Sequence, residues 1–322
     1  MRPFPYFEIL QQAWTYTRRR PWLWIFGFFA GGTAGINFGG FNYVFSPPTE
    51  AQVAQAEAQW GAVVSWIQFH SLWFTVIVAL VFVVSGAMIV LAGISRGALV
   101  WAGGKFSEDE RVRNLDSVDF IVVFRQGRAH FWRIVGLQVL TTLAFLAMFA
   151  LYLTPVIYLF AADAVNRAVF LSFFGLLIFI PAGITLSFMH LYGPIFLVVY
   201  GVNISSALQY SFNLFRQKFV ESLLFALLLL VTSFGFGLIL LFSLVLLGLP
   251  LLLCAYLLLR FGFLEAALVW AAGSGILLIC YTVVMGAAFA VFQNFAWVIA
   301  VRQMLRTVNL KKEEEAVAPE PA

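Results

Sequence analysis

Charged residues are scarce in this chain. Asp, Glu, Lys and Arg make up 11% of its 322 residues, whereas soluble domains carry about 25%. Hydrophobic residues make up 62%, and the mean hydropathy is +0.95. A chain with so little charge could not cover its own surface in water, which excludes an ordinary soluble protein and indicates an integral membrane protein.

Reactive side chains are scarce as well. The chain has 2 cysteines and 3 histidines. Cys254 and Cys280 lie in apolar stretches outside any metal-ligand spacing, so we interpret them as buried free thiols. The sequence carries no phosphate-binding glycine loop, metal-ligand cluster or nucleophile elbow. We therefore expect no cofactor, no metal, no enzymatic activity and no nucleic-acid partner.

The charge-free stretches are long. Each of six exceeds the length of about 20 residues that an apolar helix needs to cross a bilayer. The residues that bound them are Arg20 and Glu50, His70 and Arg96, Arg133 and Asp163, Arg167 and Arg216, Glu221 and Arg260, and Glu265 and Arg302. We predict six membrane spans, none of which contains a carboxylate.

The basic residues are distributed unevenly between the two sides of such a protein. If successive spans alternate in direction, only Arg167 and Arg260 lie on one side, which leaves 19 − 2 = 17 Lys and Arg residues on the other. Loops rich in Lys and Arg stay in the cytoplasm. The pattern predicts a multi-pass protein of a bacterial cytoplasmic membrane with both termini in the cytoplasm.

A turn at 248–250 would add a seventh span. It would place Arg260 and Glu265 deep in the bilayer, where each costs about 2.5–3.5 kcal/mol near the centre. Six spans are therefore favoured, and Pro250 is interpreted as a kink or an end of a long fifth span.

The opening stretch TRRRPWLWIFGFFAGG, from Thr17, is similar both to a twin-arginine export signal and to a first membrane anchor. A removable signal would explain only the first of six hydrophobic stretches. The later five therefore favour an anchor.

The sequence pattern at the start of the chain occurs three times. It consists of an apolar helical face, a basic end and then a predicted membrane span. Apolar residues three or four apart form one face of an amphipathic helix, which suits the membrane interface. The copies are Phe7, Leu10, Trp14, Arg18 and Arg20; Ser117, Phe120, Phe124, Arg128 and His130; and Ser205, Leu208, Phe212, Arg216 and Lys218. The alternative is coincidence, since aromatic and basic residues flank most spans. The interface basic residues are Arg18, Arg19, Arg20, Arg128, Arg216 and Lys218.

The predicted fold is an all-α integral membrane protein with six transmembrane helices in three helical hairpins, each preceded by a cytoplasmic amphipathic elbow helix. Residues 1–20 form the first elbow and 21–103 the first hairpin, with an outer amphipathic segment at 46–70. Residues 104–203 hold a link, an elbow and the second hairpin. Residues 204–307 hold the third elbow and hairpin, and 308–322 form a disordered cytoplasmic tail.

A family resemblance rests on two parts of the chain. Residues 7–14 lead into 22–27, and residues 192–200 lead into 206–211. At these places the chain resembles a broad set of prokaryotic membrane proteins, similar to the membrane domain attached to some glycerophosphodiester phosphodiesterases. The resemblance implies six helices in paired hairpins and no established activity. No soluble segment here is long enough for a phosphodiesterase domain.

Gly27, Gly31, Gly35 and Gly39 repeat every four residues along one face of the first span. Such faces let helices approach closely. Packing against a neighbouring span of the same chain, with Gly86 and Gly93 as partners, is favoured over a dimer seam.

His190 is the histidine placed deepest in a charge-free stretch. Intramembrane titratable groups often mark a proton or substrate site, but a structural histidine with a hydrogen bond is the favoured interpretation. We also expect interhelical hydrogen bonds from nearby polar residues. The candidate intramembrane polar site consists of His190, Gln138, Gln293 and Asn294, with Thr141 and Thr142 as further donors.

Two functions fit this pattern. The first is a non-enzymatic membrane protein that organises lipid or partner proteins through its basic inner face, with membrane lipids, another membrane protein or a second copy as partners. The second is a transporter or flippase for an apolar or amphipathic solute, with a cavity between the repeats.

Overall fold

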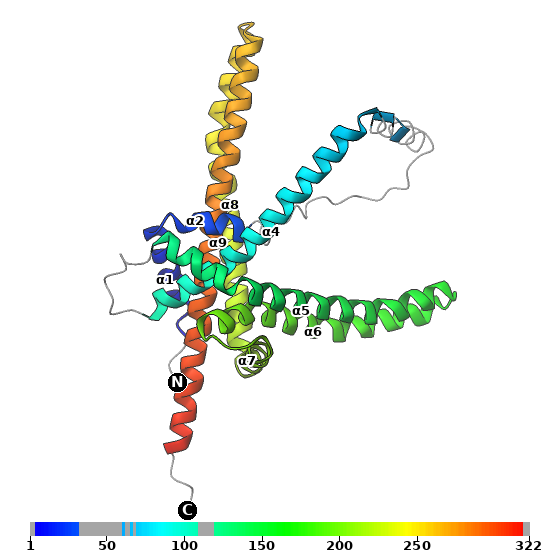
Figure 1. Ribbon diagram of the computed structural model, residues 1–322, viewed down its shortest axis with the longest axis vertical. Helices are drawn as coiled ribbons and strands as arrows, with labels where there is room; N and C mark the ends of the chain where they lie inside the picture. Colours follow the sequence, from blue (N-terminus) through cyan, green and yellow to red (C-terminus); the bar gives the residue numbers. More distant parts are fainter. Residues whose placement is uncertain (1–3, 32–59, 62–64, 67–68, 109–118, 318–322) are drawn as a thin grey trace, which may run out of the picture.

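The computed structural model describes residues 4–31, 60–61, 65–66, 69–108 and 119–317. Regular structure within these residues is entirely helical (Figure 1). The principal helices are α1 (Tyr6–Arg19), α2 (Leu23–Gly31), α4 (Ser71–Glu108), α5 (Phe120–Ala161), α6 (Val165–Val199), α7 (Ile204–Gln217), α8 (Phe219–Arg260) and α9 (Leu264–Val317).

Five of the described helices, α4, α5, α6, α8 and α9, are long and apolar enough to cross a membrane. The protein is therefore an all-α chain with the features of a multi-pass membrane protein. Most of the first predicted span, and with it most of the outer segment 46–70, lies outside the described residues. The nine-residue helix α2 occupies only the start of that span.

The molecule divides into a packed hub and three projecting arms (Figure 1). We define the hub as residues 4–31, 92–108, 119–141, 188–230 and 287–308, which hold almost all of the buried core. The arms are 71–91 of α4, 142–187 of α5 and α6, and 231–286 of α8 and α9. They leave the hub in different directions, so each presents its apolar surface separately.

The centre of the hub is a group of aromatic rings that joins α6, α7, α8 and α9. The rings of Phe188 and Phe215 stack with centroids 4.6 Å apart, and those of Phe225 and Trp297 meet edge to face at 4.9 Å. Tyr192 contacts both Phe188 and Trp297 and is fully buried. Contacts of this kind are worth about 0.5–1.5 kcal/mol per pair beyond the area that they bury, so the cluster ties the base of one arm to the base of another.

Small residues let helices cross closely in the hub. A Cβ atom on Gly97 of α4 would lie 3.2 Å from the Gly127 backbone oxygen of α5, and one on Gly127 would clash with the Ile94 backbone. A Cβ on Gly193 of α6 would lie 2.8 Å from Leu137. Because glycine has no side chain, these three positions allow α4, α5 and α6 to approach one another closely.

The turns at the arm tips use residues that tolerate a left-handed backbone. Asp163, in the 162–164 turn between α5 and α6, has a φ of 55°, and Gly262, in the 261–263 turn between α8 and α9, has a φ of 84°. Helix α8 continues unbroken through Pro250 to Arg260. The alternative turn at 248–250 is therefore wrong, and Pro250 lies inside the helix.

Two boundaries differ from the sequence-based expectation. The second elbow is not a separate helix, because α5 runs continuously from Phe120 past Arg128. Residues 128–134 contain no glycine or proline to interrupt it. The tail predicted to be disordered from residue 308 is helical as far as Val317. Residues 308–317 contain neither Gly nor Pro, and the first proline beyond the helix is Pro319.

Candidate functional site

His190 lies on α6 where that helix packs against α5. Its Nδ1 atom is 2.9 Å from the Oγ1 atom of Thr141, a buried side chain on α5. The Thr141 hydroxyl is also 3.0 Å from the backbone oxygens of Leu137 and Gln138 in its own helix. When the hydroxyl donates its hydrogen to these carbonyls, its oxygen accepts a hydrogen bond from Nδ1–H, which corresponds to the tautomer with no proton on Nε2. This pair is an interhelical hydrogen bond at the base of an arm.

Arg96 brings a positive charge to the same junction. It lies on α4, half-buried between the buried residues Ser95 and Gly97, and its charge acts on His190. The sequence pattern places Arg96 on the basic side but does not predict its link to His190. Small residues flank Arg96 in the sequence, but their burial, which brings Arg96 near α5 and α6, depends on how α4 packs on α5.

The four predicted polar residues do not form one site. Gln293 donates from Nε2 to Ser233 Oγ at 2.9 Å and so links α9 to α8. Asn294 donates to the backbone oxygen of Ala290 at 2.8 Å within its own helix. Gln138 takes part through its backbone carbonyl. The structure therefore has a His190 site between α5 and α6 and a separate Gln293 site between α8 and α9.

The glycine face of the first span packs on α9. A Cβ on Gly27 would lie 2.7 Å from Val291 and would also meet the Ala287 backbone, and one on Gly31 would lie 2.9 Å from the Ala290 Cβ. Gly86 and Gly93 are not the partners of Gly27 and Gly31, since Gly93 faces Phe131 of α5 and a Cβ on Gly86 would meet nothing within 4 Å among the described residues. Gly35 and Gly39 lie outside the described residues.

A break in the helix separates α1 from α2. Arg20 has a non-helical backbone (φ −134°, ψ 76°), because a residue before proline is driven out of the helical region and Pro21 follows it. The indole Nε1 of Trp24 donates to the backbone oxygen of Thr17 at 3.1 Å, which caps the end of α1. The guanidinium of Arg20 lies over the Phe106 ring at 5.3 Å.

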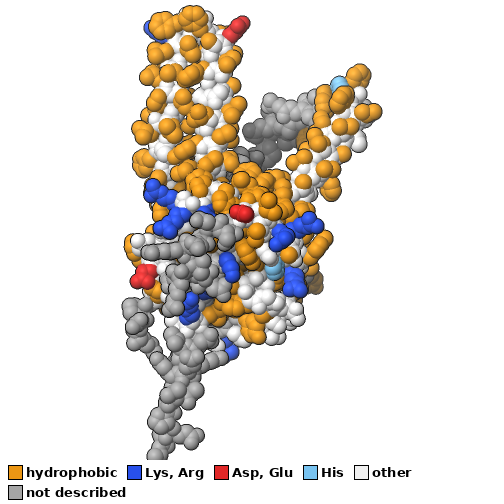
Figure 2. Space-filling model, turned by 60° about the vertical axis from the view of Figure 1, so that its left-hand side comes forward, with side chains coloured by type: hydrophobic (Ala, Val, Ile, Leu, Met, Phe, Trp, Pro, Cys, Tyr) orange, Lys and Arg blue, Asp and Glu red, His pale blue; other side chains and the backbone are white. Residues whose placement is uncertain are grey.

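The other predicted interface cations lie on the hub surface. Arg18, Arg19, Arg128 and Arg216 are exposed, and Lys218 forms an ion pair with Glu221 at 3.1 Å. Figure 2 shows Lys and Arg side chains gathered around the hub, while hydrophobic side chains cover the arms in view. Burial, and then the charge of Glu221, raise the pKa of Tyr6.

Helices α1 and α7 correspond in position. Each has 14 residues, and each begins one residue before the first motif residue, Phe7 or Ser205. Their buried residues are offset from the predicted apolar face. They are Ile9, Ala13 and Thr17 in α1, and Ala207, Ser211, Leu214 and Phe215 in α7. The motif aromatics Trp14 and Phe212 are 50% and 42% exposed and so face the surroundings.

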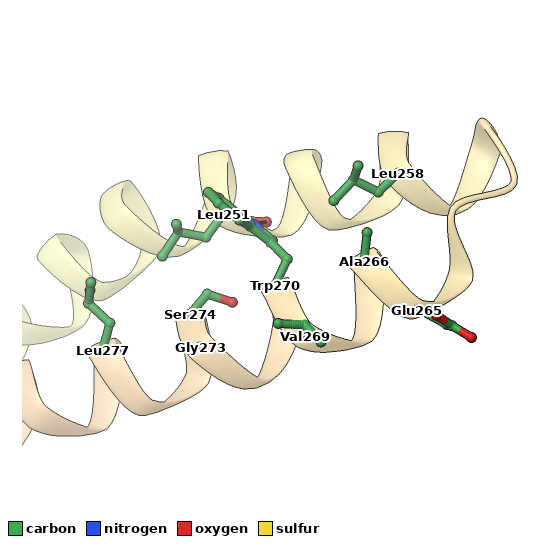
Figure 3. A pocket seen from close by; sticks show the side chains of 9 residues that line it. All are labelled: Leu251, Leu258, Glu265, Ala266, Val269, Trp270, Gly273, Ser274 and Leu277. Carbon is green, nitrogen blue, oxygen red and sulfur yellow. Dashed lines mark hydrogen bonds between the residues drawn. The ribbon is translucent and has the colours of Figure 1, made fainter.

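A pocket of about 580 Å³ lies near the tip of the α8–α9 arm (Figure 3). Trp270 extends from α9 toward α8, and its Nε1 donates to the backbone oxygen of Leu251 at 3.0 Å. Glu265 stands at the tip and points away from the hairpin. A tryptophan and a carboxylate at the end of an apolar hairpin are typical of a membrane–water interface.

Metal-ligating and thiol side chains lie apart from one another among the residues that the structure describes. No group of three His, Cys, Asp or Glu side chains gathers there. Cys254 and Cys280 are free thiols, but they are exposed on the α8–α9 arm and not buried as expected. The outer halves of α8 and α9 bury few of their side chains, so small apolar residues there face outward.

Comparison with protein-family models, curated proteins and solved structures gave no match to this chain. The candidate site thus combines a partly buried His190–Thr141 link with a basic hub and apolar arms.

Proposed function

We propose that this chain is a non-enzymatic polytopic protein of a bacterial cytoplasmic membrane that organises lipid around itself. The observation that carries the proposal is the separation of charge between hub and arms (Figure 2). Arm side chains such as Leu246 and Val269 are each 74% exposed, which only a lipid environment accommodates well. The basic hub then lies against the headgroups, where anionic lipid attracts Lys and Arg.

In this proposal the hub faces the cytoplasm and six spans leave both termini there. A repeated unit, an amphipathic helix followed by spans, accounts for the matching bounds of α1 and α7. A reporter active only in the cytoplasm should be active when fused after Lys312. The same reporter should be silent when inserted between Asp163 and Arg167, and activity there would contradict the orientation.

Lipid association tests the function directly. Purified protein is placed in vesicles that contain spin-labelled phosphatidylglycerol or phosphatidylcholine. The motionally restricted fraction should favour phosphatidylglycerol by roughly fivefold at low salt, because one Lys or Arg near the surface attracts anionic lipid by about 1 kcal/mol. The preference should fall as salt rises. Equal restriction of both lipids would contradict the proposal.

A second candidate function, a flippase or transporter for an amphipathic solute, has support from one groove. A cavity of about 420 Å³ lies where the α5–α6 arm meets the start of α8, with a largely apolar lining and one hydroxyl. Its lining residues are Phe145, Phe179, Ile180, Gly183, Ile184, Ser187, Phe188 and Leu223. Such a groove has room for part of an acyl chain.

The two functions separate in a lipid-flipping assay. A flippase would accelerate the bleaching of inner-leaflet fluorescent lipid by an external reductant, and Ile184→Trp should slow it by filling the groove. Ile178→Trp is the matched control, because Ile178 lies on the same helix and is 72% exposed. A wild-type protein that does not accelerate bleaching supports the first function alone.

A further inference from the structure

A cavity on the hub combines two arginines with two tyrosines. Its volume is about 590 Å³, within the range of about 300–1,000 Å³ typical of small-ligand sites. The lining residues are Phe196, Tyr200, Val202, Tyr210, Arg302, Leu305 and Arg306. No carboxylate is among these described lining residues, and the two arginines give this part of the hub positive charge.

Three elements bring these side chains together. Gly201 adopts a φ of 68° after the end of α6, which turns the chain toward α7 and places Tyr200 and Val202 at the cavity. The rings of Tyr200 and Tyr210 lie 5.6 and 5.9 Å from that of Phe196 and form one aromatic wall. Helix α9 supplies the opposite, basic wall.

The arginines are placed differently. Arg302 is half-buried and donates from Nη1 to Ser107 Oγ of α4 at 2.9 Å, which fixes its side chain. Arg306 lies one helical turn further on and is exposed. Residues four apart lie on the same face of a helix, so both guanidiniums serve one cavity.

The cavity lies at the depth where the apolar segments end. Arg302 is the first charged residue after the stretch that begins at Glu265, and Tyr200 directly follows the apolar helix α6. Tyrosine rings and snorkelling arginines are typical of the headgroup region. A ligand here would contact headgroups and the first part of the acyl chains together.

We propose that this cavity is a binding site for the phosphate group of an anionic phospholipid. The guanidiniums of Arg302 and Arg306 hold the phosphate oxygens, since arginine matches phosphate through paired charge-assisted hydrogen bonds. The aromatic wall of Phe196, Tyr200 and Tyr210 packs against the glycerol and upper acyl chain. That apolar wall assigns the site to a lipid phosphate in preference to a free phosphate. The inference rests on the proposed lipid-organising function and names its site.

Native mass spectrometry of the full-length protein in mild detergent tests this site. Phosphatidylglycerol should bind as one tight equivalent, and phosphatidylcholine should bind weakly. Arg306→Gln should weaken the tight equivalent at least about tenfold, the effect of losing a charge-assisted hydrogen bond. Arg125→Gln removes an equal charge from an exposed position on α5 and should change it less than twofold. Tyr210→Leu should weaken it by a smaller factor.

The outcomes are distinguishable. If Arg306→Gln and Arg125→Gln have the same effect, the site is overturned while general attraction to anionic lipid stands. If millimolar inorganic phosphate displaces the lipid fully, the cavity recognises free phosphate and the lipid assignment is wrong. If the wild type has no preference for phosphatidylglycerol over phosphatidylcholine, the proposed function itself fails. Unchanged gel-filtration and circular-dichroism profiles ensure that each variant is folded.

Discussion

The α5–α6 arm and the α8–α9 arm are held together by different contacts. In the α5–α6 arm, Phe179 lies at the centre of an aromatic group, with ring centroids 5.7, 5.9 and 5.4 Å from Phe145, Phe149 and Tyr152. The ring of Tyr152 covers Gly175, and its hydroxyl donates to the Ser172 backbone oxygen at 3.1 Å. The helices are paired mainly by ring packing.

The α8–α9 arm has hydrogen bonds at intervals along its length. Gln293 donates to Ser233 near the hub, Tyr281 donates to Ser243 Oγ at 3.0 Å in the middle, and Trp270 donates to the Leu251 backbone oxygen near the tip. One stacked pair that joins the two helices, Phe236 and Phe289, lies close to the hub with centroids 4.2 Å apart. Outward from there α8 is rich in leucine, whereas α9 also contributes alanine, valine and glycine.

This difference follows from what lipid does to helix packing. Leucine gains little by leaving lipid for another leucine, because the acyl chains are as apolar as the side chain. A leucine-rich hairpin therefore needs either interlocking rings or hydrogen bonds to fix its register. The first arm has rings and the second has polar links, each worth about 0.6 kcal/mol on average in membrane proteins.

The largest expected effect is that of Phe179→Ala. It removes the ring that three others contact, and we expect a loss of about 2 kcal/mol, below the 3–5 kcal/mol of a fully buried phenylalanine because Phe179 is half-exposed. Titration with sodium dodecyl sulfate, followed by circular dichroism, measures the free energy of unfolding. Phe173→Ala, at a ring 64% exposed on the same helix, should cost less than about 0.5 kcal/mol. Equal costs would show that the aromatic group does not hold the arm.

His190→Gln comes next. The substitution breaks the link to Thr141 at the base of the α5–α6 arm and should cost about 1 kcal/mol. If the role of His190 is structural, lipid flipping and lipid preference should stay at wild-type values when protein amounts are equal. A loss of flipping with unchanged stability would assign His190 to a transport site and favour the second function.

Tyr281→Phe tests a single polar link in the other arm. Removal of the hydroxyl should cost about 0.6 kcal/mol, and the cost should vanish in a Ser243→Ala background because the partner is gone. Tyr256→Phe is the control, at a tyrosine on α8 that is 57% exposed. Additive effects of Tyr281→Phe and Ser243→Ala would show that the two residues are not coupled.

The smallest effect is expected from Trp270→Phe. The Leu251 carbonyl lies within the continuous helix α8, so removal of the indole donor leaves it with its helical partner and should cost about 0.3 kcal/mol. The loss should be local to the arm tip. Hydrogen exchange of residues 251–262 should accelerate, while exchange in the hub stays constant. Faster exchange throughout would show that the link supports the whole fold.

Much of the fold could be predicted from the sequence. The charge-free stretches correspond to α4, α5, α6, α8 and α9, because an uncharged apolar run of that length is stable only as a helix in lipid. The break after Arg20 was predictable from the basic cluster that ends at Pro21. The buried faces of α1 and α7 were not, because Ala13 and Ser211 are small and less apolar than the exposed Trp14 and Phe212. Hydrophobic patterning finds an apolar face but does not distinguish protein from lipid as its neighbour.

The candidate sites show the same limit. Arg302 and Arg306 are visible as a basic pair, yet their cavity depends on the turn at Gly201 and on Tyr210 of α7. Likewise, Gly27 predicts a close contact between two helices. That the contact is with α9 and not with α4 depends on how the whole hub packs. The sequence by itself determined the helical class, the long apolar helices and the clustering of basic residues, because burial in lipid and charge solvation act on each segment locally. Only the tertiary structure decided which helices meet, since in lipid that choice depends on shape, ring contacts and hydrogen bonds between residues far apart in the chain.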